Sequence, residues 1–240
     1  IIGIVSKPNI FCDQELFTQQ IVYDGVRNEI LRNGGLAIGI LPTKISNKFC
    51  TSDEIIDNSY FSQSELDDLY SLIDKCDGII IQGGLSSDEY EIKAAKYAID
   101  NDIPILGICA GFNNIIRAMG GKVFAIENSK HNNEDGKIVH KNKIKKDTLL
   151  YNILKNTEVD VNSIHTMFGN EKDIKNLDIS AYSDDVYVEA VELKNKNFYL
   201  GVKWHPELML DNKSMNDIFR YFIEVCKRKK IEKYRNCDLI

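Results

Sequence analysis

One turn constrains the fold of this chain more than any other feature. An apolar run, Ile103 to Ile108, meets a helix-like run, Phe112 to Met119, across the turn Gly107-Ile-Cys-Ala-Gly111. Glycines two residues on either side of Cys109 let a strand and a helix pass closely, and such a sharp turn presents its central residue as a nucleophile. The helix N-terminus also lowers the pKa of a thiol placed there. The alternative is a buried core cysteine between two ordinary turn glycines.

The rest of the chain alternates between strand-like and helix-like stretches, which is typical of a parallel sheet covered on both faces. We therefore expect an α/β fold with three layers, α/β/α, around a flavodoxin-like, mostly parallel sheet. The expected strands are 1–5, 36–41, 78–81 and 103–108, and the expected helices are 13–33, 64–75, 88–101 and 214–230. Ligands of such sheets bind at the carboxyl ends of the strands. Both Gly83-Gly84 and the cysteine turn fall there.

Other patterns complete the expected organisation. Residues 122–197 change to short strands and polar turns, and the charged stretch 127–146 indicates a solvated loop with an exposed hairpin. Ser64 is expected to cap the second helix, and the basic run Lys227 to Lys230 to lie at the C-terminus of the last one. Since no linker interrupts the sequence, we expect residues 1–240 to form a single domain.

A thiolate that attacks an acyl group needs a general base, and the chain has four histidines, His131, His140, His165 and His205. His205 ends an apolar strand and precedes a proline, which stops further strand pairing. Residues i and i+2 of an extended segment point the same way, so Glu207 is placed to hydrogen-bond one nitrogen of His205 while the other faces the thiol. The pattern predicts a Cys-His-Glu triad. A strand-end histidine beside a surface glutamate is the alternative.

Composition narrows the classes of function. The formal net charge of −6 argues against nucleic acid or an anionic membrane as partner, because both attract basic patches. The six cysteines include no Cys-x-x-Cys pair, so we expect neither a zinc site nor a disulfide framework, and no metal. The chain has no phosphate loop, and we expect no cofactor. No apolar run approaches the roughly 18 residues that span a bilayer. These features favour a cytoplasmic enzyme acting on a small molecule.

Ordered sequence blocks resemble the class I glutamine amidotransferase family, and within it the free-standing γ-glutamyl hydrolases of the peptidase C26 branch, typified by γ-glutamyl-γ-aminobutyrate hydrolase. These blocks are Ile2-Gly-Ile-Val5, Gln82-Gly-Gly84, Gly107-Ile-Cys-Ala-Gly111, Val161-Asn-Ser-Ile-His165, Val188-Glu-Ala-Val-Glu192 and Gly201-Val-Lys-Trp-His-Pro-Glu207. The resemblance implies Cys109 as nucleophile, His205 as base and Glu207 as the residue that orients it. It also implies an oxyanion hole made of the backbone amides of Gly84 and Ala110.

The chain departs from this family around the expected substrate pocket. Ala110 stands where the hydrolase branch usually has arginine, Asn113 where it has glutamine, and Thr166-Met167 where it has His-Gln. We expect Gly83, Asn113, Thr166 and His165 to contact the substrate, with a structural histidine bonded within a turn as the alternative for His165.

Three functions remain open from the sequence. The resemblance implies first a hydrolase of γ-glutamyl amines or peptides, which works through a thioester on the cysteine. A second possibility is a glutaminase subunit that supplies ammonia to a separate synthetase, and a third is a relative that serves as a sensor or scaffold. The intact triad argues against the third. The sequence is also compatible with a homodimer of this chain.

Overall fold

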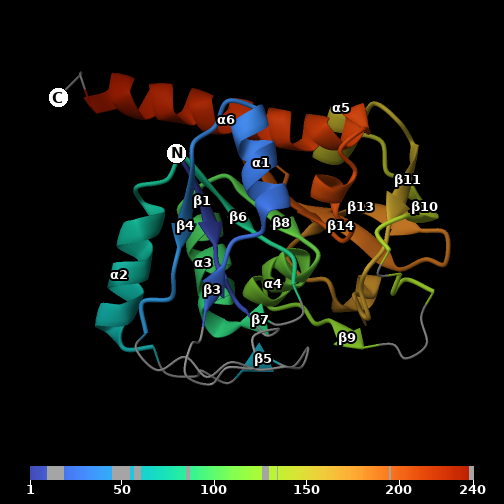
Figure 1. The fold of residues 1–240 in the computed structure, drawn as a ribbon, viewed down its shortest axis with the longest axis horizontal. Helices are drawn as coiled ribbons and strands as arrows, with labels where there is room; N and C mark the ends of the chain where they lie inside the picture. The colour runs from blue at the N-terminus through green and yellow to red at the C-terminus, as the bar shows by residue number, and fades with distance from the viewer. Residues whose placement is uncertain are drawn as a thin grey trace.

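A nine-stranded sheet runs through the protein (Figure 1). The computed structural model describes residues 1–9, 19–44, 55–56, 61–84, 87–125, 130–133, 135–194 and 196–237. In spatial order the strands are β11 (Glu158–Asn162), β10 (Ile138–Ile144), β13 (Asp178–Ser183), β14 (Val188–Glu192), β15 (Tyr199–Val202), β8 (Ile105–Ile108), β6 (Gly78–Ile81), β1 (Ile2–Val5) and β4 (Ala37–Ile40).

The sheet has a parallel part and an antiparallel part. The five strands from β15 to β4 run parallel to one another, whereas the four strands from β11 to β14 pair antiparallel and join the parallel part at β15. Three short pairs lie outside this sheet: β2 (Lys7–Pro8) with β3 (Gln20–Ile21), β5 (Ile55–Ile56) with β7 (Ser87–Asp88), and β9 (Phe124–Ala125) with β12 (Met167–Phe168).

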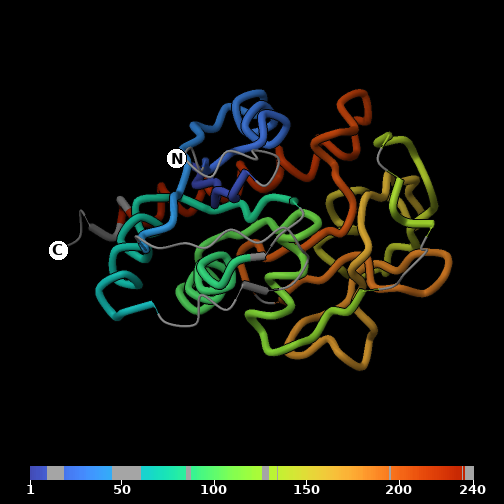
Figure 2. The backbone as a smooth tube through the Cα atoms, turned by 60° about the horizontal axis from the view of Figure 1, so that its bottom comes forward, coloured from blue at the N-terminus to red at the C-terminus, as the bar shows by residue number. Residues whose placement is uncertain are grey.

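Helices cover both faces of the sheet, which confirms the expected three layers (Figures 1 and 2). One hydrophobic core includes residues of α1 (Asp24–Arg32), α5 (Leu149–Leu154) and α6 (Lys213–Cys237), and a second includes residues of α2 (Gln63–Ile73), α3 (Glu89–Asp100) and α4 (Ala110–Ala118). Two short 3-10 helices, η1 (Glu171–Asp173) and η2 (Pro206–Leu208), lie in connections. None of the helices in the described ranges is both long and apolar enough to cross a bilayer.

The central strands are continuous apolar runs because both of their faces are covered. All four residues of β6 are buried. Ile80 packs in the core with α1 and α6, while Ile79 and Ile81 pack in the core with α3 and α4, as the two-residue period of a strand requires. Each such side chain stabilises the fold by roughly 1.5–3 kcal/mol. The two helical layers are therefore fixed to the same few strands.

The starts of two helices differ from the expected ones. The first helix was expected over 13–33, but α1 begins at Asp24, and Gln20–Ile21 is a strand paired with Lys7–Pro8. Residues 13–18 of that expectation lie outside the described residues. The cap of α2 is Ser62 rather than Ser64, because the Ser62 hydroxyl accepts from the backbone N–H of Glu65 and the Glu65 carboxylate accepts from the backbone N–H of Ser62. This reciprocal pair satisfies two amides of the first turn.

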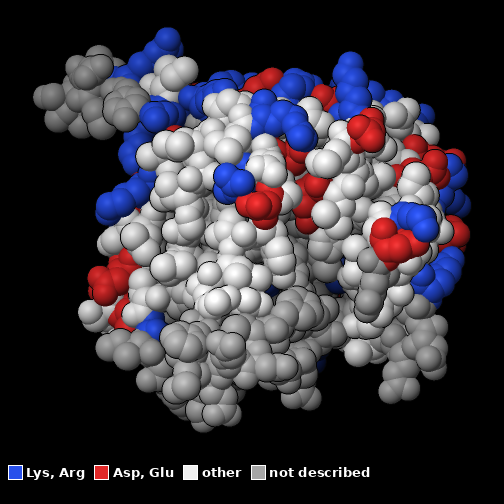
Figure 3. All heavy atoms as spheres, viewed as in Figure 1, with Lys and Arg blue, Asp and Glu red and all other residues white. Residues whose placement is uncertain are grey.

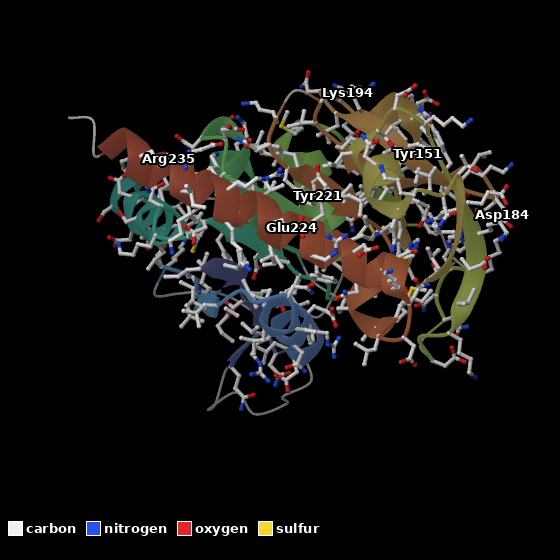
Figure 4. All side chains as sticks on the ribbon, turned by 90° about the horizontal axis from the view of Figure 1, so that it is seen from above. Tyr151, Asp184, Lys194, Tyr221, Glu224 and Arg235 are labelled. Carbon is white, nitrogen blue, oxygen red and sulfur yellow. The ribbon has the colours of Figure 1, made fainter. Side chains whose placement is uncertain are left out.

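The last helix is longer than expected, so its basic run is not at its end. The run Lys227 to Lys230 lies about two turns before the C-terminus of α6. Lys229 Nζ is 3.4 Å from Asp102 Oδ2 and Lys230 Nζ is 3.6 Å from Asp77 Oδ2. Lysines and arginines gather along this helix in Figure 3, and Figure 4 shows how α6 continues from Tyr221 to Arg235. The run therefore pairs with loops at the sheet rather than with the helix terminus.

Close backbone packing holds the turn between β8 and α4. A Cβ atom at Gly111 would lie 1.9 Å from the carbonyl oxygen of Ile81, far inside van der Waals contact, so helix α4 can approach β6 only with glycine here. A Cβ atom at Gly39, on β4, would meet its nearest neighbour at 3.5 Å, an ordinary contact.

We expect Gly111→Ala to lower the melting temperature by roughly 5–10 °C, or to prevent folding, because backbone must move to admit the methyl group. The matched control Gly39→Ala should stay within about 2 °C of the original chain. Thermal unfolding followed by circular dichroism measures both. A Gly111→Ala chain as stable as the control would show that the turn is looser than described.

Candidate active site

Cys109 occupies a strained position between β8 and α4. Its backbone has φ +52° and ψ −100°, an uncommon conformation for a residue with a side chain. The residue is the N-cap of α4 and accepts a hydrogen bond at its carbonyl from the backbone N–H of Asn113. The strain is maintained by the packing of Gly111 against Ile81, and it presents the thiol at the carboxyl end of the sheet.

His205 reaches the same edge because β15 pairs in parallel with β8. Val202 lies opposite Ile108 in the register, so the residues that follow each strand are neighbours. His205 Nδ1 lies 2.7 Å from Glu207 Oε1, and Glu207 stands in η2. The imidazole of His205 and the side chain of Cys109 line the same cavity, and a Cβ atom at Gly83 would lie 2.6 Å from His205 Cε1 and 3.4 Å from Cys109 Cβ. The structure thus brings together the three residues that the sequence grouped as a triad.

Asn162 holds the backbone of His205 from the far side. Its side-chain N–H donates to the carbonyl of His205 at 2.9 Å, and its side-chain oxygen accepts from the His205 N–H at 2.8 Å. Asn162 is fully buried at the end of β11. The sequence analysis included this residue in a family block without giving it a role, because its partner is 43 positions away.

The oxyanion loop is held by contacts that the sequence analysis did not foresee. Gln82 donates to the carbonyls of Val5 and Ile21 and accepts from the N–H of Tyr23. Gly84 has φ +147°, and a Cβ atom there would lie 2.4 Å from Lys7 Cδ. Both the conformation and the close approach require glycine.

The buried ion pair between Lys7 Nζ and Glu91 Oε1, 2.6 Å long, fixes the side chain that passes Gly84. Ala110, the first residue of α4, supplies another N–H without a partner inside its helix. The role of the Gly84 and Ala110 amides as oxyanion donors stays a prediction from the sequence.

Cys109 opens into a cavity of about 340 Å³, within the range of small-molecule sites. The described residues that line it are Tyr23, Asp24, Gly25, Gly83, Gly84, Cys109, Ile164, His205, Glu207 and Leu208. Tyr23, Ile164 and Leu208 had no signal in the sequence, since each comes from a different segment and none belongs to a motif with a stated role.

Of the residues expected to bind substrate, only Gly83 lines this cavity. Asn113 is buried, and its side-chain oxygen accepts from Lys203 Nζ at 3.0 Å. His165 is buried against His131 and Phe168. Thr166, which follows it, is not among the lining residues either. The expected contacts of Asn113, His165 and Thr166 with the substrate stay predictions.

A comparison with family models identifies the family of this chain. The Peptidase C26 family model matches residues 1–207. The chain belongs to the Peptidase C26 family. Its fold is that of class I glutamine amidotransferases.

Relatives are similar over parts of their own length. A CTP synthase of Methanosphaera stadtmanae is 31% identical over 190 residues, which cover 66% of this chain and 36% of the synthase. A putative glutamine amidotransferase of Schizosaccharomyces pombe is 30% identical over 63% of this chain and 70% of its own. This chain thus spans about a third of the CTP synthase that it matches.

Solved structures show the same fold at lower identity. A putative GMP synthase subunit from Thermoplasma acidophilum superposes with a TM-score of 0.66 at 20% identity, over 97% of this chain and 96% of that one. The glutaminase domain of Trypanosoma brucei CTPS with bound acivicin superposes with a TM-score of 0.64 at 18% identity, over 95% of this chain and 93% of that one.

Electrostatics in this Peptidase C26 member favour an ionised thiol. Burial alone would raise the pKa of Cys109, but the charges of His205 and Lys203 and the hydrogen bond with His205 lower it to about 7. Burial opposes the charged form of His205, yet the carboxylate of Glu207 and the thiolate raise its pKa well above the usual value. Near neutral pH the pair therefore tends toward thiolate and imidazolium, the reactive form of a cysteine nucleophile.

Alkylation tests the state of the thiol. We expect iodoacetamide to label Cys109 before Cys76, whose pKa burial raises to about 11, and before Cys226, whose pKa burial also raises. The thiolate is present above the lowered pKa and lost below it, so labelling should rise about fivefold from pH 6 to pH 7 and level off above about pH 8. Peptide mapping by mass spectrometry measures the order in which the cysteines are labelled. First labelling of Cys12 or Cys237 with activity retained would contradict the assignment.

Proposed function

We propose that this chain hydrolyses γ-glutamyl amide bonds, in γ-glutamyl amines or peptides, with Cys109 as nucleophile, His205 as base and Glu207 as the residue that orients it. The observation that carries the proposal is the placing of Cys109, His205 and Glu207 at the wall of one largely apolar cavity, with Glu207 2.7 Å from the imidazole. The neighbouring N–H groups of Gly84 and Ala110 complete the site.

The reaction follows from these positions. The Cys109 thiolate attacks the amide carbonyl, and the oxygen that becomes negative is stabilised by the N–H groups of Gly84 and Ala110. As the C–N bond breaks, the His205 imidazolium gives its proton to the leaving amine, and a thioester forms on the sulfur. His205, now neutral, takes a proton from water, which attacks the thioester and releases the carboxylic acid and the thiolate.

The shape of the cavity supports a substrate larger than glutamine. Ile164, Leu208 and the ring of Tyr23 form apolar parts of the wall, and these suit the carbon atoms of an amine or peptide better than ammonia, the leaving group from glutamine. Ala110, short where the family usually has arginine, leaves the start of α4 free of a long charged side chain. Both features favour a bulky or apolar group beyond the scissile bond.

The relatives favour a second candidate function, that of a glutaminase subunit working with a separate synthetase. Several of the similar proteins are CTP synthases, and two similar structures are described as a glutaminase domain and as part of a synthase. A protein of this kind would use the same triad on free glutamine. The two functions therefore differ in substrate and partner rather than in chemistry.

Substitutions of His205 and Glu207 test the roles of these two residues. We expect His205→Ala to lower kcat by about 10⁴-fold or more, because the reaction loses its base and acid. Glu207→Gln should lower kcat by about two orders of magnitude less, because Glu207 only orients the base. Steady-state kinetics on a γ-glutamyl amine measure both. Equal and mild losses would show that another group is the base.

Substrate assays decide between the two functions. We expect the purified chain to release amine from γ-glutamyl amines or peptides with a kcat/KM at least about tenfold above that for free glutamine, a difference of roughly 1.4 kcal/mol in transition-state binding. Cys109→Ala is the control and should abolish both reactions. Glutaminase activity that appears only after a synthetase is added would overturn the proposal and establish the second function.

A further inference from the structure

Three histidines and a glutamate converge in a buried cluster behind the active site. The cluster consists of His131, His140, His165 and Glu189. One candidate ligand atom from each lies within 4.8 Å of all the others, and all four side chains are buried, with residue exposures of 0%, 6%, 5% and 0%. They come from separate segments, with His140 on β10 and Glu189 on β14.

Three of the four side chains in the cluster have unused hydrogen-bonding capacity, whereas His131 Nδ1 lies 3.1 Å from Ser163 Oγ, a contact that an ion would replace. Among the described residues, neither ring nitrogen of His140 or of His165 has a hydrogen-bond partner of standard geometry, and neither does Glu189 Oε1. Glu189 Oε1 lies 3.6 Å from His165 Nε2 and 3.9 Å from His131 Nδ1. Buried polar atoms are costly without a partner, so this arrangement indicates a bound species between them.

The remaining atoms of the cluster are held from outside. Glu189 Oε2 accepts from Asn142 Nδ2 at 3.3 Å, which leaves Oε1 directed at the histidines. His131 Nε2 lies 3.1 Å from the carboxylate of Asp185, which in turn accepts from Ser183 Oγ. A carboxylate behind an imidazole is the outer-shell pattern that fixes the tautomer of a metal-binding histidine. Asp185 follows Asp184, which Figure 4 labels, in the turn between β13 and β14.

We propose that His131, His140, His165 and Glu189 bind one divalent transition-metal ion of the class that prefers imidazole ligands, with zinc as its representative. Three histidines and a carboxylate suit tetrahedral zinc, whose ligands at about 2.0–2.1 Å from the ion lie about 3.3 Å from one another. The candidate ligand atoms lie within 4.8 Å of one another, so a contraction of up to about 1.5 Å completes that geometry. Calcium and magnesium are excluded because they prefer oxygen ligands.

Four protein ligands close the coordination sphere, which makes this a structural site. The ion would join β10 and β14 to the segment that carries His165. The backbone N–H of His165 donates to the carbonyl of His131 at 3.1 Å, and the carbonyl of the preceding residue, Ile164, lies 3.9 Å from Cys109 Sγ. The expectation of no metal rested on the cysteines, and this cluster uses none of them.

Metal binding is best measured in the Cys109→Ala chain, because the thiolate and His205 could themselves take zinc. The chain is stripped with EDTA, dialysed and loaded with Zn²⁺ or Co²⁺ alone. We expect one ion per chain by elemental analysis, the visible absorption bands of four-coordinate Co²⁺, and a melting temperature about 5–10 °C higher with free zinc near a hundredfold Kd. No activity is needed for any of these readouts.

Matched variants locate the site. Glu189→Gln and His140→Asn should each weaken binding at least about a hundredfold, and Asp185→Asn about 10–100-fold through loss of the outer carboxylate. Glu192→Gln is the control, since Glu192 is equally buried on β14 but caps α5 through the N–H groups of Leu149 and Leu150. With Glu192→Gln added, the Cys109→Ala chain should bind zinc as tightly as it does without that substitution.

Two outcomes would overturn the proposal. One is a folded Cys109→Ala chain that takes up no stoichiometric zinc or cobalt, which would indicate water or a proton between the histidines. The other is zinc uptake that Glu189→Gln and His140→Asn leave unchanged, which would place the ion elsewhere. Circular dichroism of each variant without metal distinguishes loss of binding from loss of the fold.

Discussion

The contact between Cys109 and His205 is the interaction on which the rest of the site depends. Two buried groups that would each be neutral alone become charged because they face each other, with Glu207 behind the imidazole. Such a pair keeps its charges only if its atoms stay close together, because a buried charge without a partner is costly. The fold meets this requirement through the parallel pairing of β8 and β15, which end side by side.

Several backbone contacts keep that geometry. Asn162 grips both backbone polar groups of His205, and the conformation of Cys109 is maintained by the approach of Gly111 to β6. These contacts join the antiparallel and parallel parts of the sheet at the reactive centre, since Asn162 belongs to β11 and Cys109 follows β8. The site therefore needs the whole sheet, although its chemistry involves few residues.

The sequence predicted the features that depend on neighbours along the chain. The strand-to-helix turn at Cys109 and the two-residue spacing of His205 and Glu207 are local patterns, and the central strands and most helices follow from hydrophobic period. The wall of the cavity was not predictable in this way, because Tyr23, Ile164 and Leu208 meet only in the folded chain. The histidine cluster escaped notice for the same reason, since Glu189 lies 24 residues or more from each of its histidines.

The packing of Gly111 against Ile81 has an evolutionary consequence. The position of the thiol is set by main chain against main chain, whereas the wall of the cavity is made partly of side chains from loops and helix ends. Mutations at Tyr23 or Leu208 can thus reshape what enters the cavity without moving the sulfur. A family built on this turn is able to change its substrates many times while retaining one nucleophile.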